Sequence, residues 1–285
     1  MSRYSEKIFQ KLQLLKEELP YYIQRKWQEA NKQIGYNSYA KFVILSRKRS
    51  GSNFLKSSLN SHPNIRAYNE LFHSKDYASW GMKGYNIRLF NRKVDKLRQT
   101  DLNKFMNDYV YRKYNKNIKA VGFKLFYIHG RHNQSRTIWD YLTENKDIKI
   151  LRLVRKNYLA VITSKHEAIK SKTWVVTKQK SFAKSVDPVY LNPQKCEHLF
   201  RCFNKEDQIL RKRFKHHKYL YITYKEITSD NEALERVQDF LNVDIQSLTA
   251  STKKQAKRPL SKRIANYEEL YEYFADTQWH RFFIT

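Results

Sequence analysis

The sequence has few cysteines and no long apolar run. Its two cysteines, Cys196 and Cys202, are too few for a disulfide framework and lack metal-ligand spacing. The longest apolar runs have the length of strands, which argues against a transmembrane helix. The first 27 residues carry charges every few positions and no apolar core, so they do not have the pattern of a signal peptide. These absences favour a reduced, cytoplasmic protein.

Acidic residues are also scarce: 27 Asp and Glu stand against 56 Lys and Arg, for a formal net charge of +29. This excess indicates an anionic partner, although a chain rich in Lys, Asn, Tyr and Ile also follows from an AT-rich genome. Hydrophobic residues make up 41% of the chain and aromatic residues 15%, which is a globular composition and not a disordered one. A chain of 285 residues can bury a sizeable core as one domain.

Short apolar runs alternate with amphipathic stretches along the chain. The runs have the pattern of buried parallel strands and cover residues 42–45, 120–126, 148–154 and 219–223. The stretches between them are typical of helices and cover about 53–61, 132–145, 157–170 and 193–217. This alternation predicts an α/β fold, in which a parallel sheet of four or five strands is flanked by helices. Because ligands bind at the carboxyl ends of such strands, the loops after Leu45, Phe126 and Val154 are the places for a site.

The loop after the first predicted strand reads SRKRSGSNF, from Ser46 to Phe54. A helix start, the hydroxyls of Ser50 and Ser52 and the cation of Arg49 all suit phosphate binding. A Walker loop would end in Gly-Lys-Ser/Thr to hold a Mg²⁺-bound triphosphate, and that ending is missing. A P-loop-type kinase is therefore disfavoured, and a Ser-capped turn between strand and helix is the structural alternative.

The loop after the third predicted strand begins with Arg155, in LRLVRKNYLAVITS. Thr163 and Ser164 follow eight and nine residues later, a little over two helical turns, so that one of the two hydroxyls lies on the Arg155 side. An Arg with a nearby hydroxyl suits a second phosphate, whereas a lone Arg more often caps a strand end. Two phosphate sites at neighbouring strand ends indicate a nucleotide phosphorylated at two positions.

Taken in order, these motifs resemble the sulfotransferases that use 3′-phosphoadenosine 5′-phosphosulfate (PAPS), and among them the bacterial carbohydrate- and nodulation-type branch. The family's first motif stands as Arg49-Ser50-Gly51-Ser52-Asn53-Phe54, and the second as Arg155 with Thr163 or Ser164. Further matching segments are HPNIRAYNELF, VGFKLFY, YITYKEI and PLSKRIANYEEL. Asn53 departs from the pattern, because the family has a second hydroxyl there.

The resemblance implies a P-loop-like fold and an activity. The protein would transfer a sulfuryl group from PAPS, without a metal, to a hydroxyl or to an amine or carbamoyl nitrogen. The acceptor would be a glycan or a specialised metabolite such as an alkaloid. The implied nucleotide-binding residues are Arg47, Lys48, Arg49, Ser50, Gly51, Ser52, Asn53, Phe54, Arg155, Thr163, Ser164, Lys254, Lys262 and Arg263.

The resemblance also implies catalytic roles. Arg49 matches the family's cation that stabilises the departing 5′-phosphate, with Arg47 and Lys48 as rivals for that role. Glu70 is the candidate general base, and His73 and His129 are its alternatives because imidazole titrates in the right range. Lys124 would hold the transferring sulfonate or an acceptor oxygen.

The implied organisation is an N-terminal helical extension, 1–36, followed by a PAPS-binding domain, 37–285. The extension has the pattern of an amphipathic helix that is interrupted near Pro20 and packs on the core. Within the domain, 171–192 is a candidate insertion that shapes the acceptor pocket, and 248–285 is a tail that closes over the nucleotide. The aromatic side chains available to line that pocket are Trp80, Tyr85, Trp174 and Tyr190.

A basic nucleic-acid-binding protein is the hypothesis from another class, since the net charge is +29 and the chain has 21 tyrosines. The sequence has no RNA-binding signature and no Cys/His finger, and its aromatic residues lie within the periodic segments instead of one basic patch. We therefore expect a small-molecule or glycan acceptor and not nucleic acid as the partner.

Overall fold

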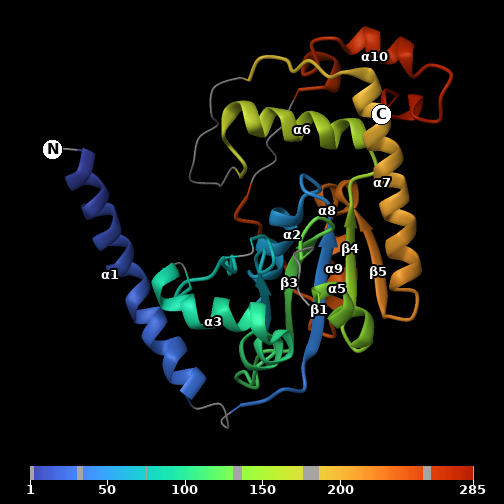
Figure 1. The fold of residues 1–285 in the computed structure, drawn as a ribbon. Helices are drawn as coiled ribbons and strands as arrows, with labels where there is room; N and C mark the ends of the chain where they lie inside the picture. Colours follow the sequence, from blue (N-terminus) through green and yellow to red (C-terminus); the bar gives the residue numbers. More distant parts are fainter. Residues whose placement is uncertain are drawn as a thin grey trace.

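The fold is built on a parallel five-stranded sheet (Figure 1). The structure is a computed structural model of the chain, and it describes residues 3–30, 35–74, 76–85, 87–130, 137–175, 186–252 and 258–284. The strands are β1 (Ala40–Ser46), β2 (Ile65–Tyr68), β3 (Ala120–Phe126), β4 (Lys149–Val154) and β5 (Tyr219–Thr223). Their order is β2-β3-β1-β4-β5, and all neighbours are parallel. The predicted α/β class with a parallel sheet is confirmed.

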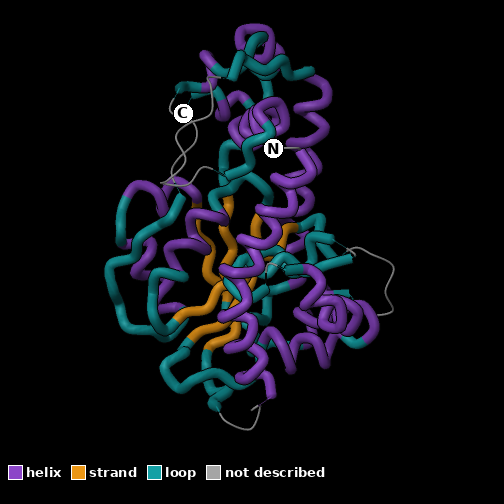
Figure 2. Tube along the Cα trace, turned by 90° about the vertical axis from the view of Figure 1, so that its left-hand side faces the viewer, coloured by secondary structure: helices purple, strands orange, loops and turns teal. Residues whose placement is uncertain are grey.

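Helices connect the strands and cover both faces of the sheet (Figure 2). They are α1 (Arg3–Ala30), α2 (Ser52–Leu59), α3 (Arg88–Thr100), α4 (Leu102–Phe105), α5 (Ile138–Glu144), α6 (Tyr158–Ser171), α7 (Pro193–Arg213), α8 (Tyr224–Ser229), α9 (Glu232–Phe240) and α10 (Tyr267–Tyr273). Short π- and 3₁₀-helical turns occur at η1 (Met106–Val110), η2 (Leu260–Lys262) and η3 (His280–Phe282). Within the described ranges, no helix combines the length and the apolar character needed to cross a membrane.

Strand β2 was not among the four runs predicted as strands. It has only four residues, IRAY, and one of them, Arg66, is exposed. It pairs with β3 alone, at the edge of the sheet. An edge strand this short carries too little apolar pattern to be distinguished from the turn that precedes it.

Helix α1 corrects the prediction of an interruption near Pro20. It runs without a break through its 28 residues, with Pro20 inside it. Proline removes one backbone hydrogen bond from a helix, but Pro20 is exposed, so water can satisfy the carbonyl that loses its donor.

The helix is attached to the rest of the protein through polar side chains. The Glu18 carboxylate accepts from the Gly84 N–H at 2.6 Å, and Arg25 Nη1 donates to Asn91 Oδ1 on α3 at 2.8 Å.

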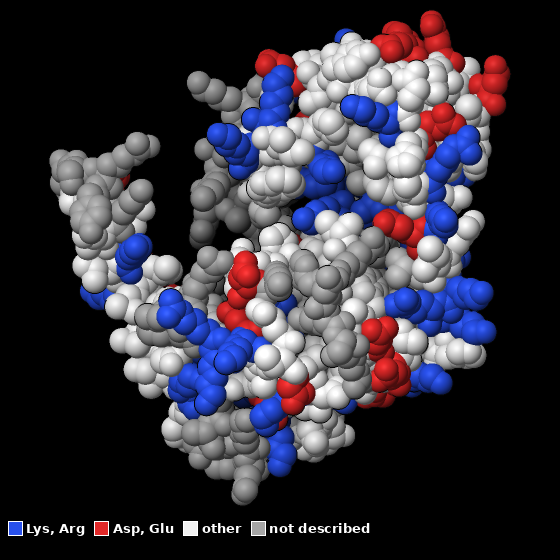
Figure 3. All heavy atoms as spheres, in the orientation of Figure 1, with Lys and Arg blue, Asp and Glu red and all other residues white. Residues whose placement is uncertain are grey.

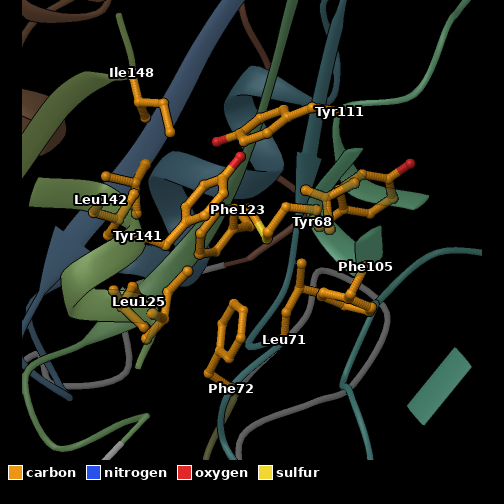
Figure 4. Packing of buried hydrophobic residues seen from close by; sticks show 14 of the residues in the cluster. Tyr68, Leu71, Phe72, Phe105, Tyr111, Phe123, Leu125, Tyr141, Leu142 and Ile148 are labelled. Carbon is orange, nitrogen blue, oxygen red and sulfur yellow. The ribbon is translucent and has the colours of Figure 1, made fainter. Parts of the chain in front are cut away.

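The two faces of the sheet form separate cores. Along β1, Val43 and Leu45 face one core, and Phe42 and Ile44 face the other. The first core packs the sheet against α4, η1, α5 and the C-terminal end of α7, and part of it is seen in Figure 4. The second packs it against α2, α8 and α9. With both faces covered, the strands read as continuous apolar runs, which is why four of them could be predicted.

A third cluster lies beyond the carboxyl edge of the sheet, where α6, the N-terminal half of α7 and α10 meet (Figure 1). Tyr158, Phe200 and Phe274 are among its buried aromatic side chains. We call this part of the fold the helical cap. A cavity lined by residues of α6 and of the loops after the strands lies between the cap and the carboxyl ends of the strands.

A buried ionic cluster fastens α7 to the sheet. Arg152, fully buried in β4, donates to the Asp207 carboxylate on α7, and the Tyr158 hydroxyl donates to the same carboxylate at 2.8 Å. Arg47, directly after β1, donates to the Glu206 carboxylate at 3.0 Å and lies 3.6 Å from Asp207 Oδ1. The cluster therefore joins β1, β4, α6 and α7.

Removing Asp207 should be costly, because it leaves the buried Arg152 without its carboxylate. We expect Asp207→Ala to lower the free energy of unfolding by about 3 kcal/mol. The control is Asp147→Ala, which removes the exposed partner of Lys41 and should cost less than about 1 kcal/mol. Urea unfolding of both variants measures the difference, and equal losses would contradict the role of the buried cluster.

Candidate active site

A cavity of about 1750 Å³ opens between the carboxyl edge of the sheet and the helical cap. Among the described residues that line it, Lys and Arg outnumber carboxylates by seven to two, Glu70 and Glu226 being the acids. The cations are Lys48, Arg49, Arg155, Lys156, Lys225, Arg258 and Arg263. Figure 3 shows Lys and Arg side chains gathered in the hollow below the cap. A cleft with this charge concentrates a multivalent anion.

The loop between β1 and α2 turns sharply at the cavity wall. Arg49 has φ 68° and Gly51 has φ 87°, so both are left-handed. A Cβ on Gly51 would lie 2.4 Å from the Tyr224 ring, which leaves room only for glycine. A left-handed backbone conformation at a residue other than glycine is strained, and such strain is typical of functional sites. The turn brings Ser52 and Asn53, the first residues of α2, to the cavity wall, where the first helical N–H groups have no partner within the helix.

Two arginines from neighbouring strand ends meet in the cavity. Arg49 Nε donates to Ser164 Oγ at 3.0 Å, and its Nη1 donates to the Trp174 carbonyl at 2.6 Å. Arg155 Nη1 donates to the Arg49 carbonyl at 3.4 Å, and its guanidinium lies 4.9 Å from the centroid of the Tyr224 ring. Burial lowers the pKa of Arg155 to about 10 and also lowers the pKa of Arg49. Both guanidinium groups would gain from a bound anion.

The sequence did not show which of the two hydroxyls, that of Thr163 or that of Ser164, faces the cavity, and the structure does. Ser164 lines the cavity, whereas Thr163 is fully buried and its Oγ1 donates to the Leu159 carbonyl of α6 at 2.8 Å. Ser50, in the loop after β1, does not line the cavity. Its hydroxyl is buried and bonded to none of the described residues.

The C-terminal segment contributes one strong attachment to α6. Arg263 donates to both oxygens of the Glu167 carboxylate, at 2.8 and 2.5 Å, and also lines the cavity. Arg258, which is not among the residues that the sequence motifs imply, lines the cavity as well. Lys262 is exposed and does not line it, and Lys254 lies outside the described residues.

A second polar cluster combines α2, β3 and the segment after β2. Lys124 on β3 is fully buried, donates to Asn53 Oδ1 and lies 3.1 Å from Glu70 Oε1. Glu70 Oε2 lies 3.8 Å from His129 Nε2, and the rings of His129 and His73 meet edge to face with centroids 5.5 Å apart. Burial lowers the pKa of Lys124. Glu70, Asn53 and His73 line the cavity, while Lys124 and His129 lie buried behind them.

Lys56 belongs to this cluster but was missed from the sequence. It lies one turn after Asn53 on α2, and its Nζ donates to the Gly81 carbonyl at 3.1 Å. Burial, and then the charge of Lys124, lower the pKa of Lys56 to about 8. The three-residue spacing from Asn53 was the available signal, because it puts both side chains on one side of α2.

Several other candidates lie elsewhere in the structure. Arg47 points to α7, where its guanidinium lies 4.0 Å from the centroid of the Phe203 ring. Trp80 and Tyr85 stack on each other in the sheet core, with centroids 4.4 Å apart, and do not line the cavity. Trp174 lines the cavity and Tyr190 does not. Among the described residues, no group of three or more His, Cys, Asp or Glu is placed to hold a metal ion.

The chain is similar over most of its length to curated proteins named Nodulation protein H. It is 25% identical over 245 residues to the protein of Rhizobium meliloti, which covers 85% of this chain and 94% of the relative. It is 27% identical over 252 residues to the protein of Rhizobium tropici, which covers 85% of this chain and 92% of the relative. No protein-family model matches the chain.

The lowered pKa of Lys56 predicts a pH-dependent stability. Because the pKa in the folded state is about 8 and the ordinary value is 10.5, the folded protein binds fewer protons than the unfolded chain between these values. The free energy of unfolding therefore rises with pH between these two pKa values. Below the lower one, Lys56 is charged in the folded protein, and the full cost of burying its charge lowers the stability. We expect Lys56→Met to be more stable than the wild type at neutral pH, with a difference that shrinks toward pH 10.5.

Urea unfolding at a series of pH values measures this difference. Lys195→Met, which changes an exposed lysine on α7, is the control and should show no such trend. A stability difference between Lys56→Met and the wild type that does not vary with pH would contradict the lowered pKa of Lys56.

Proposed function

We propose that this protein is a PAPS-dependent sulfotransferase that acts on a hydroxyl or a nitrogen of a glycan or small metabolite. The observation that carries the proposal is the meeting of two cationic sites in one cavity, one after β1 and one after β4, next to the Glu70 carboxylate. The similarity to Nodulation protein H, at about one quarter identity, supports the nodulation-type branch that the motifs resemble.

The residues of the cavity fit a nucleotide with phosphates at two positions. The start of α2, with Ser52 on the cavity wall, offers N–H groups and a hydroxyl to the 5′-phosphosulfate. Arg155 and Ser164 offer a guanidinium and a hydroxyl to the 3′-phosphate. Arg49 lies between these two places, since its side chain contacts Ser164 and its carbonyl accepts from Arg155. Its charge would act on both phosphates, including the 5′-phosphate that departs.

Catalysis would then depend on one proton transfer and on fixed charges. Glu70 takes the proton of the acceptor as the acceptor atom forms its bond to sulfur, and the bond from sulfur to the bridging phosphate oxygen breaks. Lys124, 3.1 Å from Glu70, holds the carboxylate in place, and His129 lies at its second oxygen. Arg49 stabilises the negative charge that develops on the departing phosphate. His73 also lines the cavity and is the alternative base.

Nucleotide preference tests the proposal. Adenosine 3′,5′-bisphosphate should raise the melting temperature, with a gain of about 2.7 kcal/mol at a hundred times its Kd, whereas ATP with Mg²⁺ and a DNA oligomer should have little effect. Arg155→Ala should weaken binding of the bisphosphate at least about tenfold and leave 5′-AMP binding unchanged. The control, Arg201→Ala, removes an exposed arginine of α7. Stabilisation by ATP with Mg²⁺ alone would rule out the proposed donor.

The role of Glu70 has a separate test. Glu70→Gln keeps the shape of the side chain but cannot accept the proton, so turnover should fall by about 10²–10⁴ while the Kd for the bisphosphate stays the same. Release of the bisphosphate from PAPS, with a panel of oligosaccharide, phenol and amine acceptors, measures turnover. An active Glu70→Gln together with an inactive His73→Gln would assign the base to His73.

A further inference from the structure

Helix α1 carries an apolar stripe that faces away from the protein. Ile8, Leu12, Leu15, Leu19 and Ile23 follow one another at spacings of three or four residues, so they lie on one side of the helix. Their exposed fractions range from 37% to 59%. Five large apolar side chains exposed along one helix face indicate a binding surface rather than scattered exposure.

The attachment of α1 to the protein does not use this stripe. Among the residues of α1 whose burial the structure describes, Glu18 and Arg25 are buried, and both are held by polar contacts with residues near α3. The N-terminal half of α1 stands clear of the rest of the molecule in Figure 1. The stripe is therefore presented outward while the helix is held in place through its polar side.

The exposed charged residues that border the stripe are lysines. Lys11 lies three and four residues from Ile8 and Leu15, and Lys16 lies four and three residues from Leu12 and Leu19, so both lysines border the stripe. The exposed acids Glu6 and Glu17 have no stripe residue at these spacings and lie on other sides of the helix.

This arrangement distinguishes two possible occupants. Two copies that paired through the stripe would bring Lys11 and Lys16 of each copy together, with no exposed acid among the described residues of α1 beside them, which is unfavourable. A surface of anionic lipid instead accepts the apolar side chains between its headgroups while the flanking lysines extend to the phosphates.

Further cations lie beside α1. Asn91 of α3, which accepts from Arg25, is followed by the exposed Arg92, Lys93 and Lys96. Figure 3 shows Lys and Arg side chains gathered over this region. We propose that α1 lies in the headgroup region of an anionic bilayer, parallel to its surface, and attaches the protein to the membrane without crossing it. This proposal does not depend on the proposed activity.

Co-sedimentation of the full chain with vesicles tests the proposal. The vesicles are pure phosphatidylcholine, or phosphatidylcholine with one quarter phosphatidylglycerol. We expect the protein to sediment with the anionic vesicles at low salt, and binding to weaken as salt is added. The stripe variant Leu12→Gln, Leu15→Gln, Leu19→Gln should lose more than about tenfold in partitioning, and Lys11→Gln with Lys16→Gln should lose several-fold.

The matched control changes three exposed apolar residues outside the stripe, Leu14→Gln, Ile209→Gln and Ile245→Gln, and should bind like the wild type. Circular dichroism checks that each variant keeps its helices. Failure of the wild type to sediment with anionic vesicles, or equal losses in the control and the stripe variant, would overturn the proposal. So would a dimer in light scattering that the stripe variant converts to a monomer, because the stripe would then join two copies of the chain.

Discussion

The geometry of the candidate site depends on the hydrogen bonds and ion pairs that the Asp207 carboxylate makes. It accepts from Arg152 of β4 and from Tyr158 at the start of α6, and Arg47 after β1 lies 3.6 Å from it. These residues flank the two loops that form the cavity wall. Arg47 comes two residues before Arg49, and Arg152 and Tyr158 stand three residues before and after Arg155. Both loops are thus fixed at points next to the arginines that face the cavity.

The same cluster determines which cations are available to a ligand. Arg47 and Arg152 are neutralised by Glu206 and Asp207 on α7, so their charges serve the fold. Arg49 and Arg155 instead line the cavity, and burial lowers the pKa of each. Desolvating a cation is unfavourable in the free protein, and an anion in the cavity offsets that cost. The cavity is therefore suited to a ligand with more than one negative charge.

The sequence identified the sheet and the loops because these depend on strong local patterns. Buried parallel strands appear as apolar runs, and the rule for their carboxyl ends selected the loop of Arg49 and the loop of Arg155. Side-chain direction within a loop depends on partners distant in the sequence, so Arg47 could not be separated from Arg49 before Glu206 on α7 was placed beside it. Thr163 and Ser164 differ by one position on a helix, about 100°, and only the packing of α6 shows which one reaches the cavity. Pro20 was misjudged because exposure, which sequence does not give, decides whether a helix tolerates proline.

Asn53 shows how a departure from a family pattern can carry structural information. Lys124 is fully buried, and its ammonium needs acceptors for its N–H donors. Asn53 Oδ1 and Glu70 supply two of them. A serine hydroxyl at position 53 ends one atom earlier along the side chain, so it would not reach as far toward Lys124. The amide therefore joins the start of α2 to the Glu70 cluster through a single buried ammonium. A phosphate held at the start of α2 and an acceptor held at Glu70 would in this way be positioned by one connected set of side chains.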